Sequence, residues 1–138
     1  MAEFSVKRIE EMEGIGPRGV FKRARGELGV SAFGMAVIEM PPHADQYPEH
    51  SHADDGQEEV YTAMTGSGEI EIEGERHRID PDTMVRVAPG VTRKVWTGDD
   101  SLRLLIIGGV PGKVYEPPEF SKLGTPDPTK AQTATQDV

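Results

Sequence analysis

The stretch Glu49–Gly68 carries the residues that predict both the fold and the candidate site. It reads E-H-S-H-A-D-D-G-Q-E-E-V-Y-T-A-M-T-G-S-G. In it, His50 and His52 are separated by a single residue. Residues two apart on a strand point to the same side, whereas a helix would turn them about 200° apart. The spacing therefore favours a strand that aims both imidazoles at one point. Glu59 adds a carboxylate where the next apolar run begins.

Two imidazoles and one carboxylate are the ligand set of many non-haem iron sites, and the same set suits zinc, manganese or nickel. We therefore expect His50, His52 and Glu59 to hold a divalent metal ion. Gln57 has the strand parity of Glu59 and is a competing ligand. Tyr61 has the same parity and is expected inside, where its hydroxyl can serve a ligand or simply be satisfied within the core.

The composition narrows the class of protein. The chain has 138 residues, enough for one domain, and a net charge of −9 without a cluster of Lys and Arg, which argues against nucleic acid and anionic membrane surfaces as partners. It has no cysteine, so a disulfide frame and a thiol nucleophile are excluded. The N-terminus has no apolar signal core, and the longest strongly apolar run, Leu104–Ile107, is too short to span a bilayer. We expect a cytoplasmic protein.

Short β-rich segments recur every eight to twelve residues between turn signals, and no long helical period appears. This pattern predicts an all-β, antiparallel sandwich or barrel. Residues 1–29 are expected to form an N-terminal arm with a short strand, residues 30–112 the barrel, and residues 113–138 a C-terminal arm ending in a disordered tail from Ser121. The expected strands are 20–25, 30–40, 47–52, 59–65, 69–73, 77–79, 84–88, 92–97 and 102–107.

From about Pro41 to Gly109 the sequence resembles the cupin superfamily, in particular its small single-domain, conserved-barrel members. The first motif of that family is matched by His50-Ser51-His52 and by Glu59, which is followed after six residues by Gly66. The second motif is matched by Pro89-Gly90. The resemblance implies a jelly-roll barrel with a metal inside one mouth, and a homodimer.

Three departures from the family pattern affect the site. Arg93 stands where a fourth, metal-binding histidine would be. The gap between His52 and Glu59 is at least two residues longer than usual, and the leading glycine of the first motif falls at Ala44. Arg93 can orient an anionic substrate beside the metal, or it can pair with Glu59 in a barrel that has lost its metal.

These observations lead to alternative functions. The first is a divalent-metal-dependent enzyme of oxygenase or isomerase type acting on a small molecule, for which Arg93 favours an anionic one; Arg93 and Tyr61 would be its catalytic residues. The second is a metal-free cupin that binds a small molecule without catalysis. A third is a structural role for a homodimer. The isolated residues His43 and His77 are expected at the surface.

Overall fold

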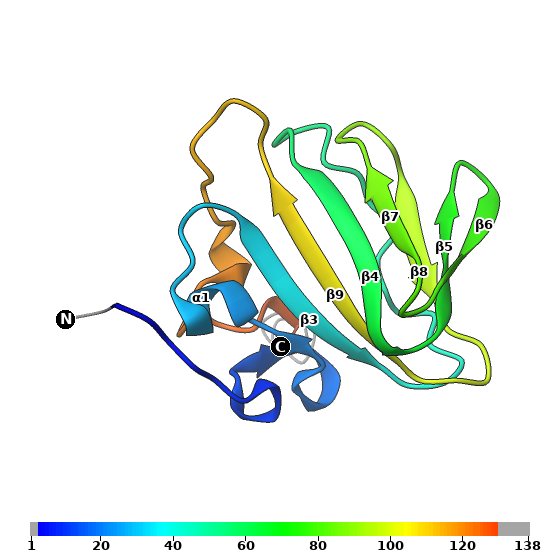
Figure 1. Cartoon of the computed structure of the whole chain (residues 1–138), viewed down its shortest axis with the longest axis horizontal. Coiled ribbons are helices and arrows are strands. Elements are labelled where there is room, and N and C mark those ends of the chain that lie inside the picture. Colours follow the sequence, from blue (N-terminus) through cyan, green and yellow to red (C-terminus); the bar gives the residue numbers. More distant parts are fainter. Residues whose placement is uncertain (1–2, 130–138) are drawn as a thin grey trace, which may run out of the picture.

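Two antiparallel sheets pack face to face in the computed structural model, which describes residues 3–129 (Figure 1). Within these residues the larger sheet has the strand order β1-β2-β3-β9-β4-β7, and the smaller sheet has the order β6-β5-β8. The strands are β1 (Gly14–Ile15), β2 (Phe21–Lys22), β3 (Gly34–Met40), β4 (Glu58–Gly66), β5 (Gly68–Ile72), β6 (Glu75–Ile79), β7 (Met84–Val87), β8 (Arg93–Trp96) and β9 (Leu102–Gly109). The predicted all-β jelly-roll fold is confirmed.

Short helices accompany the strands: η1 (Ile9–Glu11), η2 (Pro17–Gly19), α1 (Ala24–Leu28) and η3 (Glu119–Ser121). Helix α1 was not predicted, and the strand expected at residues 20–25 is shorter than predicted, because β2 ends at Lys22 and α1 begins at Ala24. The helix ends at Gly29, whose φ of 78° is left-handed, and its buried Ala24 packs with Val37 on the outer face of β3. The helix therefore owes its place to a contact with a distant strand, which no local period announces.

The strand expected at residues 47–52 is largely absent. Only His50 pairs there, in an isolated antiparallel bridge with Arg93 at the start of β8. The His50 N–H donates to the Arg93 carbonyl at 3.0 Å, and the Arg93 N–H donates to the His50 carbonyl at 2.9 Å. This single bridge still orients His50, because it ties the loop to the smaller sheet.

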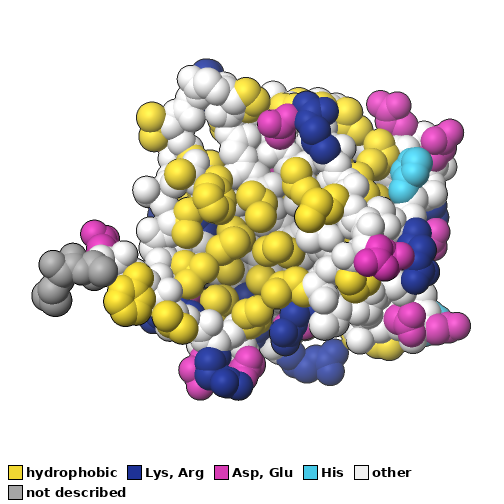
Figure 2. Space-filling view, in the orientation of Figure 1, with side chains coloured by type: hydrophobic (Ala, Val, Ile, Leu, Met, Phe, Trp, Pro, Cys, Tyr) yellow, Lys and Arg dark blue, Asp and Glu magenta, His cyan; other side chains and the backbone are white. Residues whose placement is uncertain are grey.

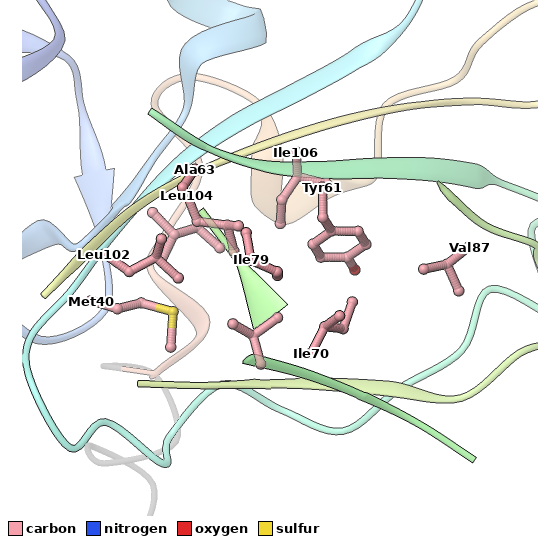
Figure 3. Packing of buried hydrophobic residues seen from close by; sticks show 11 residues of the cluster. Met40, Tyr61, Ala63, Ile70, Ile79, Val87, Leu102, Leu104 and Ile106 are labelled. Carbon is pink, nitrogen blue, oxygen red and sulfur yellow. The ribbon is translucent and has the colours of Figure 1, made fainter. Parts of the chain in front are cut away.

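The core fills the space between the two sheets (Figure 3). Tyr61 and Leu104 come from the larger sheet and Ile70 and Val95 from the smaller, and all four are fully buried. Residues of one parity on β4, namely Glu59, Tyr61 and Ala63, face this interior, as the alternation predicted. On β8, Arg93 and Val95 share one parity and are both fully buried in the same interior.

The C-terminal segment returns to the N-terminal one and is held there by Arg23, whose side chain is buried. Its Nε donates to the Phe120 carbonyl at 2.8 Å, and its Nη1 donates to the Thr125 carbonyl at 3.0 Å. The rings of Phe21 and Phe120 also meet edge to face, with centroids 5.7 Å apart. The tail expected from Ser121 is thus packed over residues 121–129, and its remainder, 130–138, lies outside the described residues.

The outer face of the larger sheet is apolar over its centre, as Figure 2 shows. Ile107 of β9 remains 36% exposed there, while Phe33, just before β3, and Met64, at a bulge of β4, are 37% and 40% exposed. On the smaller sheet, Trp96 points outward between two cations, with the Arg76 guanidinium 4.7 Å and the Lys94 ammonium 4.4 Å from its ring. Within the described residues, no helix has the length and apolar composition needed to cross a membrane.

Two glycines with left-handed φ give a test of how the barrel closes. At Gly66 (φ 78°) an added Cβ would lie 1.9 Å from the Ser101 carbonyl oxygen, whereas at Gly74 (φ 84°) it would meet nothing within 4 Å. Gly74→Ala should cost about 1 kcal/mol of unfolding free energy, from the left-handed backbone alone. Gly66→Ala should cost clearly more, about 3 kcal/mol or above, because a backbone atom must also move. Urea denaturation of both variants checks this, and equal losses would contradict it.

Candidate metal centre

Three side chains converge at one mouth of the barrel. His50, His52 and Glu59 each offer a ligand atom, and these atoms lie within 4.8 Å of one another. The Nε2 atoms of His52 and His50 lie 3.2 and 4.0 Å from Glu59 Oε1. Two donors at about 2.1 Å from one ion are at most about 4.2 Å apart, so both contacts with Glu59 have the right size for a shared ion.

The other nitrogen of each imidazole is held by an acceptor. His50 Nδ1 lies 3.0 Å from the Pro48 carbonyl, and His52 Nδ1 lies 3.0 and 3.1 Å from the two carboxylate oxygens of Asp55. In a neutral imidazole these contacts place the proton on Nδ1, since a carbonyl and a carboxylate accept. Both Nε2 lone pairs are then directed toward Glu59, the orientation that metal-binding histidines need.

Asp55 was not singled out as part of the site, although it follows His52 by three residues in the turn. Its carboxylate also accepts from the Gln57 backbone N–H at 3.1 Å and from Gln57 Nε2 at 3.0 Å. The longer gap before Glu59 therefore forms a turn that orients His52. Gln57 is buried beside the cluster with its amide nitrogen committed to Asp55, and its role as a competing ligand stays a prediction.

Glu59 is held by a chain of two tyrosine hydroxyls, of which one contacts it directly. The Tyr61 hydroxyl donates to Glu59 Oε1 at 2.9 Å. Because its only proton is used there, the Tyr47 hydroxyl must be the donor in the 2.9 Å contact between the two phenols. Burial raises the pKa of both tyrosines well above their ordinary value, so both stay neutral. Tyr47, on an irregular loop, carried no sequence signal.

Arg93 lies behind this layer. Its side chain is fully buried, with Nη1 3.9 Å from Glu59 Oε1 and Nη2 donating to the Ala88 carbonyl at 3.2 Å. Its Nε and Nη1 have no hydrogen-bond partner among the described residues. The guanidinium is thus inside the barrel next to Glu59, as one alternative expected, and its catalytic role stays a prediction.

The charges of the cluster explain its protonation. The hydrogen bond to Glu59 raises the pKa of His52, against the effect of burial. Burial opposes ionisation of Glu59, but the hydrogen bond and charge of His52 outweigh it, so the pKa of Glu59 lies below its usual value. Burial lowers the pKa of His50. A proton on His52 thus offsets the carboxylates that a metal ion would otherwise neutralise.

The cluster forms part of the wall of an open cavity of about 1240 Å³. Interior residues of β3 and β9, the loop around Tyr47, and segments from both ends of the chain line it. Among the described residues, Arg93 and Tyr61 do not line this cavity, because Glu59 lies between them and its space. His43, which also lines the cavity, and His77 on β6 have side chains that are 71% and 52% exposed, which confirms their surface position.

Comparison with known proteins identifies the family to which the fold and the motifs belong. The family model of the cupin domain matches residues 36–108, more than half of the chain. The chain therefore belongs to the cupin family. Among curated protein sequences, none matches it.

Solved structures agree with this assignment. A cupin protein from Bacteroides fragilis is 20% identical, with a TM-score of 0.67 over 86% of this chain and 93% of that one. A sugar phosphate isomerase of the cupin superfamily from Silicibacter pomeroyi is 19% identical, with a TM-score of 0.58 over 70% and 59%. A predicted oxalate decarboxylase from Thermotoga maritima is 20% identical, with a TM-score of 0.51 over 57% and 68%. At these identities the likeness concerns the fold alone.

The two histidines should titrate in opposite directions in the metal-free protein. His52 should titrate above about 6.5 and His50 below it, and Asp55→Asn should lower the pKa of His52 by removing an acceptor of its Nδ1 proton. Two-dimensional NMR titration of the imidazoles measures this. The matched control is Asp82→Asn, a change of the same type at an exposed carboxylate on another turn.

The same pKa shifts predict in which direction the free energy of unfolding changes with pH. Since the folded pKa of His52 is raised, its interaction stabilises the protein fully below about pH 6.5 and is lost as the pH rises through that folded pKa. The depressed pKa of His50 acts oppositely, costing stability as the pH falls below 6.5. His52→Gln should therefore be more destabilising at pH 5.5 than at pH 9 in metal-free protein. A loss that grows with pH would contradict this assignment.

Proposed function

We propose that this chain is a divalent-metal-dependent enzyme that acts on a small, anionic molecule by isomerase- or oxygenase-type chemistry. One observation carries the proposal. Both imidazole Nε2 atoms face Glu59 Oε1 while both Nδ1 atoms are held by acceptors, at the wall of a large cavity. This arrangement presents unprotonated lone pairs to an ion, and three protein ligands leave positions open for a substrate.

Each residue has a distinct task in this proposal. His50, His52 and Glu59 hold the ion, which supplies a Lewis acid or a centre that activates dioxygen. Asp55 and the Pro48 carbonyl fix the imidazole tautomers. Tyr61 and Arg93 hold the buried Glu59 carboxylate from behind, so that it stays ionised. The elongated turn and the arginine thus support the ligands of a three-residue site.

Two proteins of the same fold support the choice of an anionic substrate. By name, one acts on a sugar phosphate and the other is a predicted decarboxylase of oxalate. Sugar phosphates and oxalate are both small anions. The net charge of −9 on this chain does not favour such molecules, so a local positive charge inside the cavity is needed.

A metal-free binding protein is the second candidate, and Arg93 is the observation that favours it. Its guanidinium occupies the place of a fourth ligand and lies 3.9 Å from Glu59 Oε1. In that function Arg93 and a protonated His52 balance the acidic groups without any ion.

Metal binding separates the two candidates. Protein purified without a histidine tag should contain about one divalent ion per chain by elemental analysis, or take it up from Fe²⁺, Mn²⁺, Ni²⁺ or Zn²⁺. His50→Ala should abolish uptake, and the matched His77→Ala should leave it unchanged, since His77 lies exposed on β6. An ion at one hundred times its Kd should stabilise the folded protein by about 2.7 kcal/mol, an effect absent in His50→Ala. No uptake of any of these ions would remove the enzyme proposal.

We also retain the homodimer as a proposal. The apolar centre of the larger sheet's outer face offers a surface for a second copy (Figure 2), because Ile107 of the central strand β9 is partly exposed there between Met35 and Val60.

Ile107→Glu should convert a dimer to a monomer in light scattering, because it puts a charge into the centre of that face. Val114→Glu, at an apolar position that is 86% exposed on the C-terminal segment, is the control. A monomeric wild type would contradict the homodimer, and a dimer that survives Ile107→Glu would contradict this face as its interface.

A further inference from the structure

A pair of glycines leaves the barrel wall bare beside the metal cluster. Gly34 on β3 and Gly108 on β9 are direct cross-strand partners. An added Cβ on Gly108 would lie 3.0 Å from Glu59 Cγ and 3.0 Å from Gln57 Oε1. Side chains of Glu59 and Gln57 thus fill the space above Gly108. A different residue fills the neighbouring space above Gly34.

Tyr115 of the C-terminal segment fills the space above Gly34. A Cβ on Gly34 would lie 2.5 Å from the Tyr115 hydroxyl oxygen. Gly34 shares the parity of Ile38 and Met40, which face the interior, so this hydroxyl lies inside the barrel mouth. Directly paired positions have Cβ atoms about 5 Å apart, so the phenol lies close to Glu59 on the same wall.

The Tyr115 residue is largely buried, but its hydroxyl is free to bind a ligand. The residue is 8% exposed and lines the cavity, and the described residues give its hydroxyl no hydrogen-bond partner. Burial raises the pKa of Tyr115, so the phenol keeps its proton and is a donor. A ligand in the cavity can therefore accept a hydrogen bond from this phenol without breaking one inside the protein.

Arg25 of α1 supplies a positive charge to the same wall. It lines the cavity, and its charge acts on the Tyr115 phenol. Its Nη1 donates to the Val30 carbonyl at 3.0 Å, but its Nε is buried without a partner among the described residues. Arg23 also lines the cavity and has an unpaired Nη2, but its charge is partly balanced by Glu13 at 3.4 Å, and two of its donors bind carbonyls of the C-terminal segment.

We propose that Tyr115 and Arg25 form an anion-binding subsite that takes the carboxylate of a small amphiphilic molecule whose other end reaches His50, His52 and Glu59. This inference rests on the proposed function and deepens it by naming the substrate class. A neutral phenol and a guanidinium that line the same cavity present the donors that a carboxylate accepts. Arg93, for which an anion-binding role was one alternative, is fully buried, so this subsite uses a different guanidinium.

The size and lining of the cavity indicate what the remainder of the ligand is like. At about 1240 Å³ it is larger than the space a simple dicarboxylate would fill. Its walls between the two ends are apolar and are formed by Phe21, Ile38, Met40, Ile106 and Phe120. A carboxylate with an aromatic or branched apolar body therefore fits better than a fully polar sugar or diacid.

Carboxylates of the protein repel an anionic ligand in this cavity, and a bound metal ion would offset that repulsion. Glu59 and Asp55 both lie near the Tyr115 phenol and raise its pKa by their charge. A divalent ion on two neutral imidazoles and Glu59 would give the cluster a charge of +1, in place of 0 when His52 carries its proton. Anion binding should therefore strengthen when the metal is present.

A matched pair of ligands tests the subsite: 3-phenylpropionate and its uncharged amide, titrated by calorimetry into the full-length chain with Zn²⁺ and after chelation. With Zn²⁺ the acid should bind at least about tenfold more tightly than the amide. Arg25→Gln and Tyr115→Phe should each weaken the acid about fivefold to tenfold and leave the amide within about twofold. Lys113→Gln, an exposed charge on the same segment, should change neither.

Gly34→Ala gives an independent variant if Arg25→Gln unfolds the protein. It should displace the Tyr115 phenol from the wall and remove the preference for the acid, while Zn²⁺ stoichiometry is kept. Equal binding of acid and amide, or an acid affinity that no variant lowers, would overturn the subsite. Zn²⁺ uptake without an acid preference leaves the proposed function standing and defeats the inference. An acid preference that depends on Arg25 in a chain that takes up no metal defeats the proposed function alone.

Discussion

A single buried carboxylate, that of Glu59, is the constraint on which the site depends. Its Oε1 atom receives the Tyr61 hydroxyl, faces the Nε2 atoms of two histidines, and lies 3.9 Å from the Arg93 guanidinium. An isolated carboxylate inside a barrel would take up a proton, but these neighbours keep its pKa low. A protonated His52 and a metal ion compete for the Glu59 carboxylate. A cation that binds between the ligands must therefore displace the proton from His52.

Most of the fold was readable from the sequence because period-two alternation in short strands sets which residues face inward. The interior positions of Glu59, Tyr61 and Val95 follow from parity alone. The His-x-His pair could be assigned because its meaning is local. The strand drawn around it was mostly wrong, yet one bridge to Arg93 suffices to aim His50.

What the sequence did not yield depends on contacts between distant segments. Asp55 orients His52 only because the long turn folds back, and Tyr47 reaches Tyr61 from an irregular loop. The cavity wall that Arg25 and Tyr115 form joins a five-residue helix to a segment about ninety positions further along. No hydrophobic period or motif announces such a meeting, since it is decided by packing after the barrel has formed.

The attachment of the two chain ends has a consequence for how molecules enter and leave. Arg23 binds the carbonyls of Phe120 and Thr125, and the Gly16 N–H donates to Asp127 at 2.9 Å. The segment so fastened is also a wall of the cavity. A ligand can therefore enter or leave through that side only if several of these contacts break together. The contacts are spread along the first twenty-odd residues of the chain. Hydrogen exchange at the Gly16 and Gly124 amides, both bonded across this seam, would report the rate of that opening.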